Sequence, residues 1–117
     1  MNTQLFLSNI AKHIRLSSLE EERILKLCTE RNLAKNEFIL QQGDWCQHIN
    51  FVNNGTLRAF FIDSKGKEST VMFGVREWWI TDMNAFVNEL PAMVSIQAVE
   101  KSSVLRLAKK CLDTLYE

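Results

Sequence analysis

Residues 73–79 of this chain read FGVREWW and residues 91–98 read PAMVSIQA, and a short segment of helical character separates them. In the second stretch, the side chains from Val94 to Ala98 alternate between inward-facing and outward-facing positions, as in a half-buried strand. Both stretches belong to a region, Glu37 to Arg106, that is rich in the β-branched and aromatic residues of strands. This region therefore predicts short strands interrupted by one short helix.

Turn signals divide the same region into strands. Gly43-Asp44 ends the first strand, Asn54-Gly55 is expected to join two strands as a tight hairpin, and the segment 63–66 (DSKG) turns into a further strand. Short strands with frequent turns predict an antiparallel sandwich or barrel. The expected strands are Phe38–Leu40, Ile49–Val52, Leu57–Ile62, Thr70–Phe73, Val94–Ala98 and Val104–Leu107.

Helical patterns stand at both ends of the chain. The first expected helix ends at about Arg15, and a second opens with the capping box of residues 18–21 (SLEE) and continues to about Glu30. A stripe at helical spacing then begins at Ala108 and continues to the last turn before Glu117. The expected apolar positions are Leu5, Phe6, Ile10 and Ile14 in the first helix, Leu19, Ile24, Leu27 and Cys28 in the second, and Ala108, Cys111, Leu112 and Leu115 in the third.

Size and charge limit the classes of protein that fit. With 117 residues, of which 46% are hydrophobic and 24% charged, the chain has room for one ordinary globular domain. Fourteen lysine and arginine residues balance fourteen aspartate and glutamate residues, so there is no net positive charge to attract nucleic acid or an anionic membrane. Neither a signal peptide nor a stretch of about 20 apolar residues is present. We expect a cytoplasmic protein without a membrane segment.

Cysteine and histidine residues give no sign of a metal site. Cys28, Cys46 and Cys111 are far apart and form no CxxC pair, which favours buried reduced thiols over a disulfide framework or a zinc knuckle. His13 and His48 share no helical or strand spacing with each other. The sequence therefore predicts no metal ion.

The order of these features resembles the cyclic-nucleotide-binding domain of the Crp/Fnr family of bacterial transcription regulators. A helix, Gly43-Asp44, the segment 51–58 (FVNNGTLR), a second hairpin, Glu77, a short helix and two closing strands follow one another from about Leu19 to Glu117. The resemblance implies a mainly β jelly roll, or double-stranded β-helix, flanked by helices. It implies a single sensor domain with helices in residues 1–31, the jelly roll in 37–107 and the start of a dimer helix in 108–117.

The same resemblance implies partners for the domain. In the family, a long helix pairs in a homodimer and leads to a helix-turn-helix domain that contacts DNA. By that resemblance the dimer seam contains Ala108, Cys111, Leu112 and Leu115, and DNA is contacted only through a domain that this chain does not contain. We therefore expect an isolated sensor domain of a longer regulator, with no specific DNA binding of its own.

The resemblance also implies a ligand site with an altered centre. In members that bind cyclic nucleotides, a glutamate after a glycine accepts a hydrogen bond from the ribose, and an arginine followed by Ser or Thr holds the phosphate. Glu77 matches the glutamate, but Arg76 stands in place of the glycine, and Ala92-Met93 stands in place of the Arg-Ser pair. Loss of such a charge-assisted pair costs about 2–5 kcal/mol. We expect that the domain binds neither cyclic AMP nor cyclic GMP and has no known cofactor. The candidate pocket contains Arg76, Glu77, Trp78, Ala92 and Met93.

Alternatives remain at several of these positions. Trp78 and Trp79 could stack on a ligand, but packing in the core or under a helix is the simpler interpretation. Glu77 could cap a turn instead of contacting a ligand, and Arg58 could face either the cavity or solvent. An apolar pocket at Ala92-Met93 would suit a filled core or a hydrophobic small molecule.

Three other classes of function compete with a sensor domain on this fold. A jelly-roll enzyme of the cupin kind needs a His-x-His pair with further metal ligands, and an iron–sulfur sensor needs about four cysteines. The chain has neither, so we expect no enzymatic activity. A dimerisation or protein-interaction module without a small ligand fits the same fold and stays open as the alternative.

Overall fold

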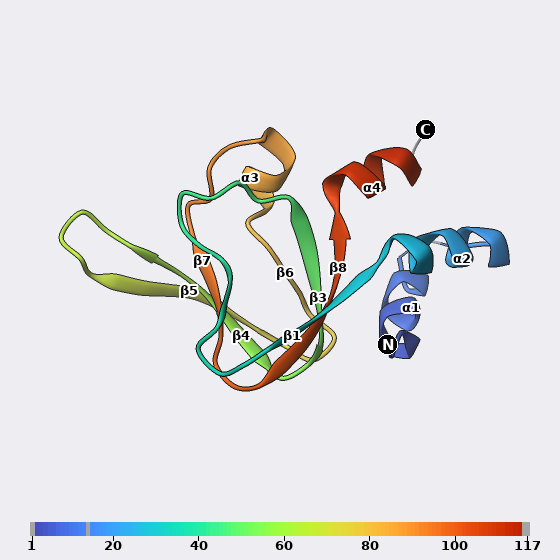
Figure 1. Cartoon of the computed structure of the whole chain (residues 1–117), viewed down its shortest axis with the longest axis horizontal. Coiled ribbons are helices and arrows are strands. Elements are labelled where there is room, and N and C mark those ends of the chain that lie inside the picture. The colour runs from blue at the N-terminus through green and yellow to red at the C-terminus, as the bar shows by residue number, and fades with distance from the viewer. Residues whose placement is uncertain (1, 14, 116–117) are drawn as a thin grey trace.

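The computed structural model describes residues 2–13 and 15–115 of the chain, and it is a jelly roll of two four-stranded antiparallel sheets (Figure 1). This confirms the mainly β fold predicted from the sequence. In the described part of the chain the two sheets face each other without closing into one barrel. The first sheet has the order β1 (Thr29–Leu33), β8 (Ser102–Ala108), β3 (His48–Asn54) and β6 (Trp79–Ile80), and the second has the order β2 (Phe38–Leu40), β7 (Ser95–Ala98), β4 (Thr56–Ile62) and β5 (Glu68–Val75).

Four helices flank the sheets: α1 (Gln4–Ala11), α2 (Ser18–Leu27), α3 (Met83–Asn88) and α4 (Lys109–Leu115). In Figure 1, α1 and α2 lie at one side of the jelly roll, the β4–β5 hairpin extends at the other, and α3 and α4 lie at the same end. A capping box opens α2, but one residue earlier than predicted. Ser17 Oγ accepts from the Glu20 N–H at 3.2 Å, and Glu20 Oε1 accepts from the Ser17 N–H at 3.0 Å.

The core between the sheets consists of the inward-facing residues of both. We call it the interior core. Alternate residues of the first part of β4 (Leu57 and Ala59) and of β7 (Ile96 and Ala98) belong to it, as strand alternation requires. Its members are Leu33, Ile39, Val52, Leu57, Ala59, Ile80, Ile96, Ala98 and Val104.

A second apolar cluster, the helix-side cluster, lies between α1, α2 and the outer face of the first sheet. The rings of Phe6, Phe51 and Trp79 are in mutual contact, with centroids 5.2–5.9 Å apart. Burial of Ile24 and Cys28 was predicted and is confirmed, whereas Leu19 is exposed. The cluster contains Phe6, Ile24, Cys28, Phe51, Leu105 and Leu107, and Leu27 is half-buried; Ile14 lies outside the described residues.

Two predicted elements were wrong. The helix predicted to continue to about Glu30 ends at Leu27, and Thr29–Leu33 is a strand, because Cys28 has an extended backbone (φ −79°, ψ 137°) and β1 pairs with β8. The expected hairpin at Gly55 does not form either, since β3 pairs with β6 and β8 while β4 pairs with β5 and β7. Gly55 (φ +95°) instead carries the chain from one sheet to the other.

The predicted β4–β5 hairpin is confirmed. Asp63 Oδ1 accepts from the backbone N–H groups of Lys65 and Lys67, each at 2.9 Å, and Gly66 adopts a positive φ of 82°. These contacts are local in sequence, which is why the turn residues alone predicted them. Among the described residues, no helix has the length and apolar character needed to cross a membrane.

Candidate ligand-binding site

The cassette between the first and second sheets consists of β6, α3 and β7. Asp82, which is 9% exposed, begins α3: its Oδ1 accepts from the Ala85 N–H at 3.1 Å and its Oδ2 accepts from the Met93 N–H at 2.8 Å. One carboxylate thus joins the first turn of the helix to the segment that follows it.

Backbone contacts hold the Ala92 segment against the turn at Gly43. The Ala92 N–H donates to the Asp44 carbonyl at 2.7 Å, and the Gly43 N–H donates to the Ala92 carbonyl at 2.8 Å. The Ala92 methyl group is 4% exposed and packs with Cys46, Ala85 and Phe86, which we call the cassette cluster, while Met93 is 67% exposed. Apolar side chains therefore fill the position at which the family resemblance implies a phosphate-binding arginine.

Arg76, Glu77 and Trp78 form the connection between β5 and β6, directly before the first strand of the cassette. All three are exposed. Glu77 has φ +74°; its N–H donates to the Val52 carbonyl at 2.8 Å, and its carbonyl accepts from Asn9 Nδ2 at 3.3 Å. The contacts of Glu77 are thus made by its backbone, in a turn next to α1.

Sequence reasoning missed Asp82, which is the carboxylate that the structure brings to Met93. The signal was an aspartate directly before a short helix, the preferred residue type for a helix N-cap. The two tryptophans also separate: Trp79 packs under α1 and donates from Nε1 to Asn9 Oδ1 at 2.7 Å, while Trp78 is 52% exposed.

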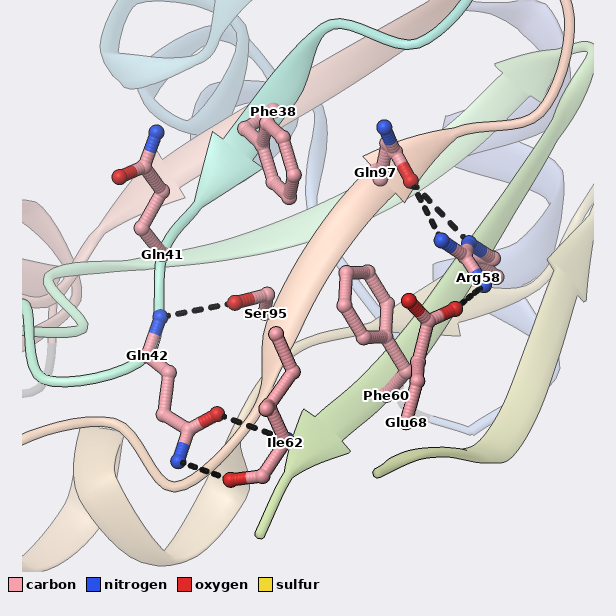
Figure 2. A pocket seen from close by; sticks show the side chains of 9 residues that line it. All are labelled: Phe38, Gln41, Gln42, Arg58, Phe60, Ile62, Glu68, Ser95 and Gln97. Carbon is pink, nitrogen blue, oxygen red and sulfur yellow. Dashed lines mark hydrogen bonds and ion pairs between the residues drawn. The ribbon is translucent and has the colours of Figure 1, made fainter. Parts of the chain in front are cut away.

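A cavity of about 450 Å³ lies on the outer face of the second sheet (Figure 2). Arg58 belongs to this outer face, because the residues on either side of it, Leu57 and Ala59, are in the interior core. None of the five residues of the predicted pocket lines this cavity. Its lining residues are Phe38, Gln41, Gln42, Arg58, Phe60, Ile62, Glu68, Ser95 and Gln97.

We call this cavity the outer groove, and the polar groups that line it are bonded to one another. Arg58 donates from Nε and Nη2 to Gln97 Oε1 at 3.1 and 2.8 Å, forms an ion pair with Glu68, and lies 4.0 Å from the centre of the Phe60 ring (Figure 2). The amide of Gln42 bonds to both backbone groups of Ile62. Because these groups satisfy each other, the groove offers few free donors to a ligand.

The predicted dimer seam is distributed over two elements. Ala108 is the last residue of β8, paired with His48, and α4 begins only at Lys109. Leu112 is half-buried against both the helix-side cluster and the cassette cluster, so it contacts its own domain. Cys111 is half-buried, and the side chain of Leu115 lies outside the described residues.

Two of the three cysteines, Cys28 and Cys46, are buried as free thiols. Burial raises the pKa of the Cys28 thiol above its ordinary range, which disfavours the reactive thiolate. Cys46 contacts Thr81 Oγ1 at 3.2 Å inside the cassette cluster. Within the described ranges, no three His, Cys, Asp or Glu side chains are grouped to hold a metal ion.

Solved structures of other proteins share this fold. The sensor domain of the transcriptional regulator DNR from Pseudomonas aeruginosa is similar over 97% of this chain and 75% of its own, with 18% identity and a TM-score of 0.84. The catabolite activator protein of Thermus thermophilus is similar over 92% of this chain and 49% of its own, with 22% identity and a TM-score of 0.77. The present chain thus spans about half the length of that activator.

A third similar structure comes from Trypanosoma brucei. It is the regulatory subunit of a cAMP-independent protein kinase A, as a triple mutant bound to cAMP, similar over 98% of this chain and 43% of its own, with 16% identity and a TM-score of 0.79. A search of curated proteins gives no match. The family model described as cyclic nucleotide-binding domain matches residues 30–117. Because that match covers most of the chain, the protein belongs to the cyclic nucleotide-binding domain family.

Proposed function

We propose that this chain is the ligand-sensing domain of a Crp/Fnr-type transcription regulator, and that its cassette binds neither cyclic AMP nor cyclic GMP. The observation that carries the proposal is the environment of Ala92: the methyl group is buried among Cys46, Ala85 and Phe86, at the position implied for the phosphate-binding arginine. A buried phosphate without a cation partner is strongly disfavoured.

Arginines near this region support the same conclusion. Arg58 forms an ion pair with Glu68 and a hydrogen bond with Gln97 on the outer face of the second sheet. Arg76 lies in the exposed turn before β6. Neither takes the place of the missing cation. Asp82 supplies a carboxylate in the cassette, but its two oxygens are occupied by backbone N–H groups of the chain itself.

A module without any small ligand is the second candidate, and the filled cassette favours it. Ala92 supplies no cation at the position implied for the phosphate, and Arg58 of the cavity on the second sheet is bonded to Gln97. In both cases the domain acts as a regulatory platform and not as an enzyme.

Assembly and DNA binding belong to the proposal as well. A homodimer would form through a continuation of α4, and DNA would be contacted by a separate helix-turn-helix domain. Leu112, which already packs inside the domain, would position that helix on the jelly roll. Gel-shift experiments with the chain alone should give no sequence-specific complex at physiological salt.

Titration calorimetry with cyclic AMP and cyclic GMP tests the ligand proposal. We expect no binding, and a dissociation constant below about 10 μM would contradict the proposal. The double variant Ala92→Arg/Met93→Ser should gain affinity for cyclic AMP, because it restores a cation and a hydroxyl donor. In the Trypanosoma brucei structure, one of the three substitutions in the cAMP-bound mutant introduces an arginine.

A matched control separates charge from shape. Ala92→Gln/Met93→Ser adds similar bulk to the cassette cluster without the charge, so it should not gain affinity. If neither double variant binds while both remain folded by circular dichroism, the cassette is closed by its own side chains, and the ligand-free module is the better description.

A further inference from the structure

A separate cavity of about 170 Å³ opens between β2 and the β3–β8 pair. Asn50 and Arg106 stand opposite each other in the register of that pair, two residues from Val52 and Val104 of the interior core. Because strand residues alternate, both polar side chains point between the two sheets. The jelly roll therefore carries an arginine on its inner side, in a cavity that shares Asp44 and Cys46 with the surroundings of Ala92.

Asn50 orients this arginine. Arg106 Nε donates to Asn50 Oδ1 at 2.9 Å, and Asn50, which is 3% exposed, donates from Nδ2 to the Ile80 carbonyl at 3.0 Å. The two terminal nitrogens of the guanidinium make no further hydrogen bond within the described residues, and Arg106 lines the cavity. A guanidinium held at Nε presents its terminal donors as a fork.

Arg106 also has no carboxylate partner among the described residues. Their ion pairs are Arg31–Glu37, Arg58–Glu68 and Lys109–Glu89. Asp44 lies at the rim of the cavity but is exposed and makes no ion pair with Arg106, so water screens its charge. A half-buried arginine without a counter-charge is unusual in a folded protein.

The surroundings of the cavity are rich in positive and neutral donors. Burial, followed by the charge of Arg31, holds the pKa of Arg106 below its ordinary value. Burial and then the charges of Arg106 and Arg31 lower the pKa of His48, which also lines the cavity. Glu37, the acid that pairs with Arg31, is bound to Arg31 and to the Ala34 N–H.

We propose that this cavity binds a small oxyanion, a carboxylate or phosphate group, with Arg106 as the anchor and Gln47 and His48 as further polar contacts. An anion that accepts both terminal N–H groups of Arg106 supplies the missing counter-charge in a bidentate geometry. The volume suits a small acid or a single phosphate group and excludes a whole nucleotide, which needs a pocket of several hundred cubic ångströms.

The position of the cavity relates it to the C-terminal helix. Gln47 at its wall accepts through its carbonyl from the N–H of Lys109, the first residue of α4, at 2.9 Å. Arg106 stands two residues before the end of β8, from which the chain enters α4 directly. A bound anion would therefore sit one hydrogen bond away from the helix through which this family assembles.

Trp45 lines the cavity and is largely exposed, so its fluorescence can report binding directly. Titration with inorganic phosphate, and separately with acetate and succinate, should give a saturable change that identifies the preferred anion. Arg106→Gln should weaken the binding about tenfold or more, because a hydrogen-bonded charge is lost. Arg106→Lys keeps the charge without the fork and should lose less.

Arg58→Gln is the matched control, because it removes an arginine of the same jelly roll that already has a carboxylate partner; its anion affinity should equal that of the unmodified chain. Thermal unfolding checks that each variant is folded, and backbone amide shifts of the unmodified chain locate the site without any substitution. The proposal is overturned if none of the three anions gives saturable binding, if Arg106→Gln binds as well as Arg58→Gln, or if the amide shifts are confined to residues that do not line the cavity.

Discussion

Asp82 bonds to Met93 across the cassette: its Oδ2 accepts from the Met93 backbone N–H at 2.8 Å while its Oδ1 caps α3. The carboxylate therefore performs two structural tasks in an almost fully buried position. In a cassette whose Ala92 is packed in an apolar cluster, this acid serves to fix the loop and is not available to a ligand.

Removal of this carboxylate should destabilise the whole domain. Asp82→Ala loses a helix cap and a charge-assisted hydrogen bond, and we expect the free energy of unfolding to fall by about 2–3 kcal/mol. Asp82→Asn keeps one acceptor and should lose less. Urea denaturation measures both, with Asn84→Ala on the exposed side of α3 as the control. Equal stability of Asp82→Ala and Asn84→Ala would refute this role.

Glu77 occupies a left-handed backbone position, φ +74°, that suits glycine. Its bonds to Val52 and Asn9 use backbone atoms, so a glycine at this position keeps them. We expect Glu77→Gly to raise the free energy of unfolding by about 0.5–1 kcal/mol and Glu77→Ala to give no gain. If Glu77→Ala stabilises the domain as much as Glu77→Gly, the loss of the Glu77 charge explains the effect and the backbone conformation does not.

These two residues also show how far the sequence predicts the site. The β4–β5 turn was predictable because Asp63 bonds to residues two and four positions away. The role of Asp82 in the cassette was not predictable, because Glu77 and Asp82 lie on either side of β6. This strand has two residues, too few to show a periodicity in the sequence. Spacing along the chain matched Glu77 to the family pattern, whereas the fold brings Asp82 to the cassette.

Contacts between distant parts of the chain explain the other errors. Thr29 pairs with Arg106 and Leu33 with Ser102, so β1 is stabilised by a strand near the other end of the chain. Helical spacing in the preceding segment extended the predicted helix to about Glu30, into the first two residues of β1, and tertiary pairing overrode that local preference. The orientation of Arg58 was equally unpredictable, since only the register of β4 with β7 assigns it to the outer face.

Gly55 permits the crossing from the first sheet to the second. A Cβ atom at this position would lie 2.6 Å from Ser102 Cβ and 2.7 Å from Ser102 Cα, and the positive φ of 95° disfavours any other residue. We expect Gly55→Ala to lower the free energy of unfolding by about 2–4 kcal/mol.

Gly66→Ala is the control for Gly55→Ala, because Gly66 has a similar φ of 82° but no atom within 4 Å of an added Cβ. It should cost only the backbone penalty, about 1 kcal/mol. Guanidinium denaturation of the two variants compares them directly. If both lose the same stability, the close approach to Ser102 makes no contribution.

His48 makes the stability of the domain depend on pH. Burial first, and then the charges of Arg106 and Arg31, lower its pKa below the ordinary value of 6.5, while exposed Asp44 is the acid at the same cavity. A lowered histidine pKa means that the unfolded chain binds the proton first as the pH falls. Stability should therefore decrease as the pH drops from about 6.5 toward the folded-state pKa, and His48→Gln should lack this part of the decrease.

NMR titration of the His48 ring measures the pKa itself. Repeating the titration in phosphate should move the pKa of His48 upward, because an anion at Arg106 offsets the positive charge beside the ring. An unchanged pKa in phosphate, with Arg106 present and the protein folded, would show that no anion binds next to His48.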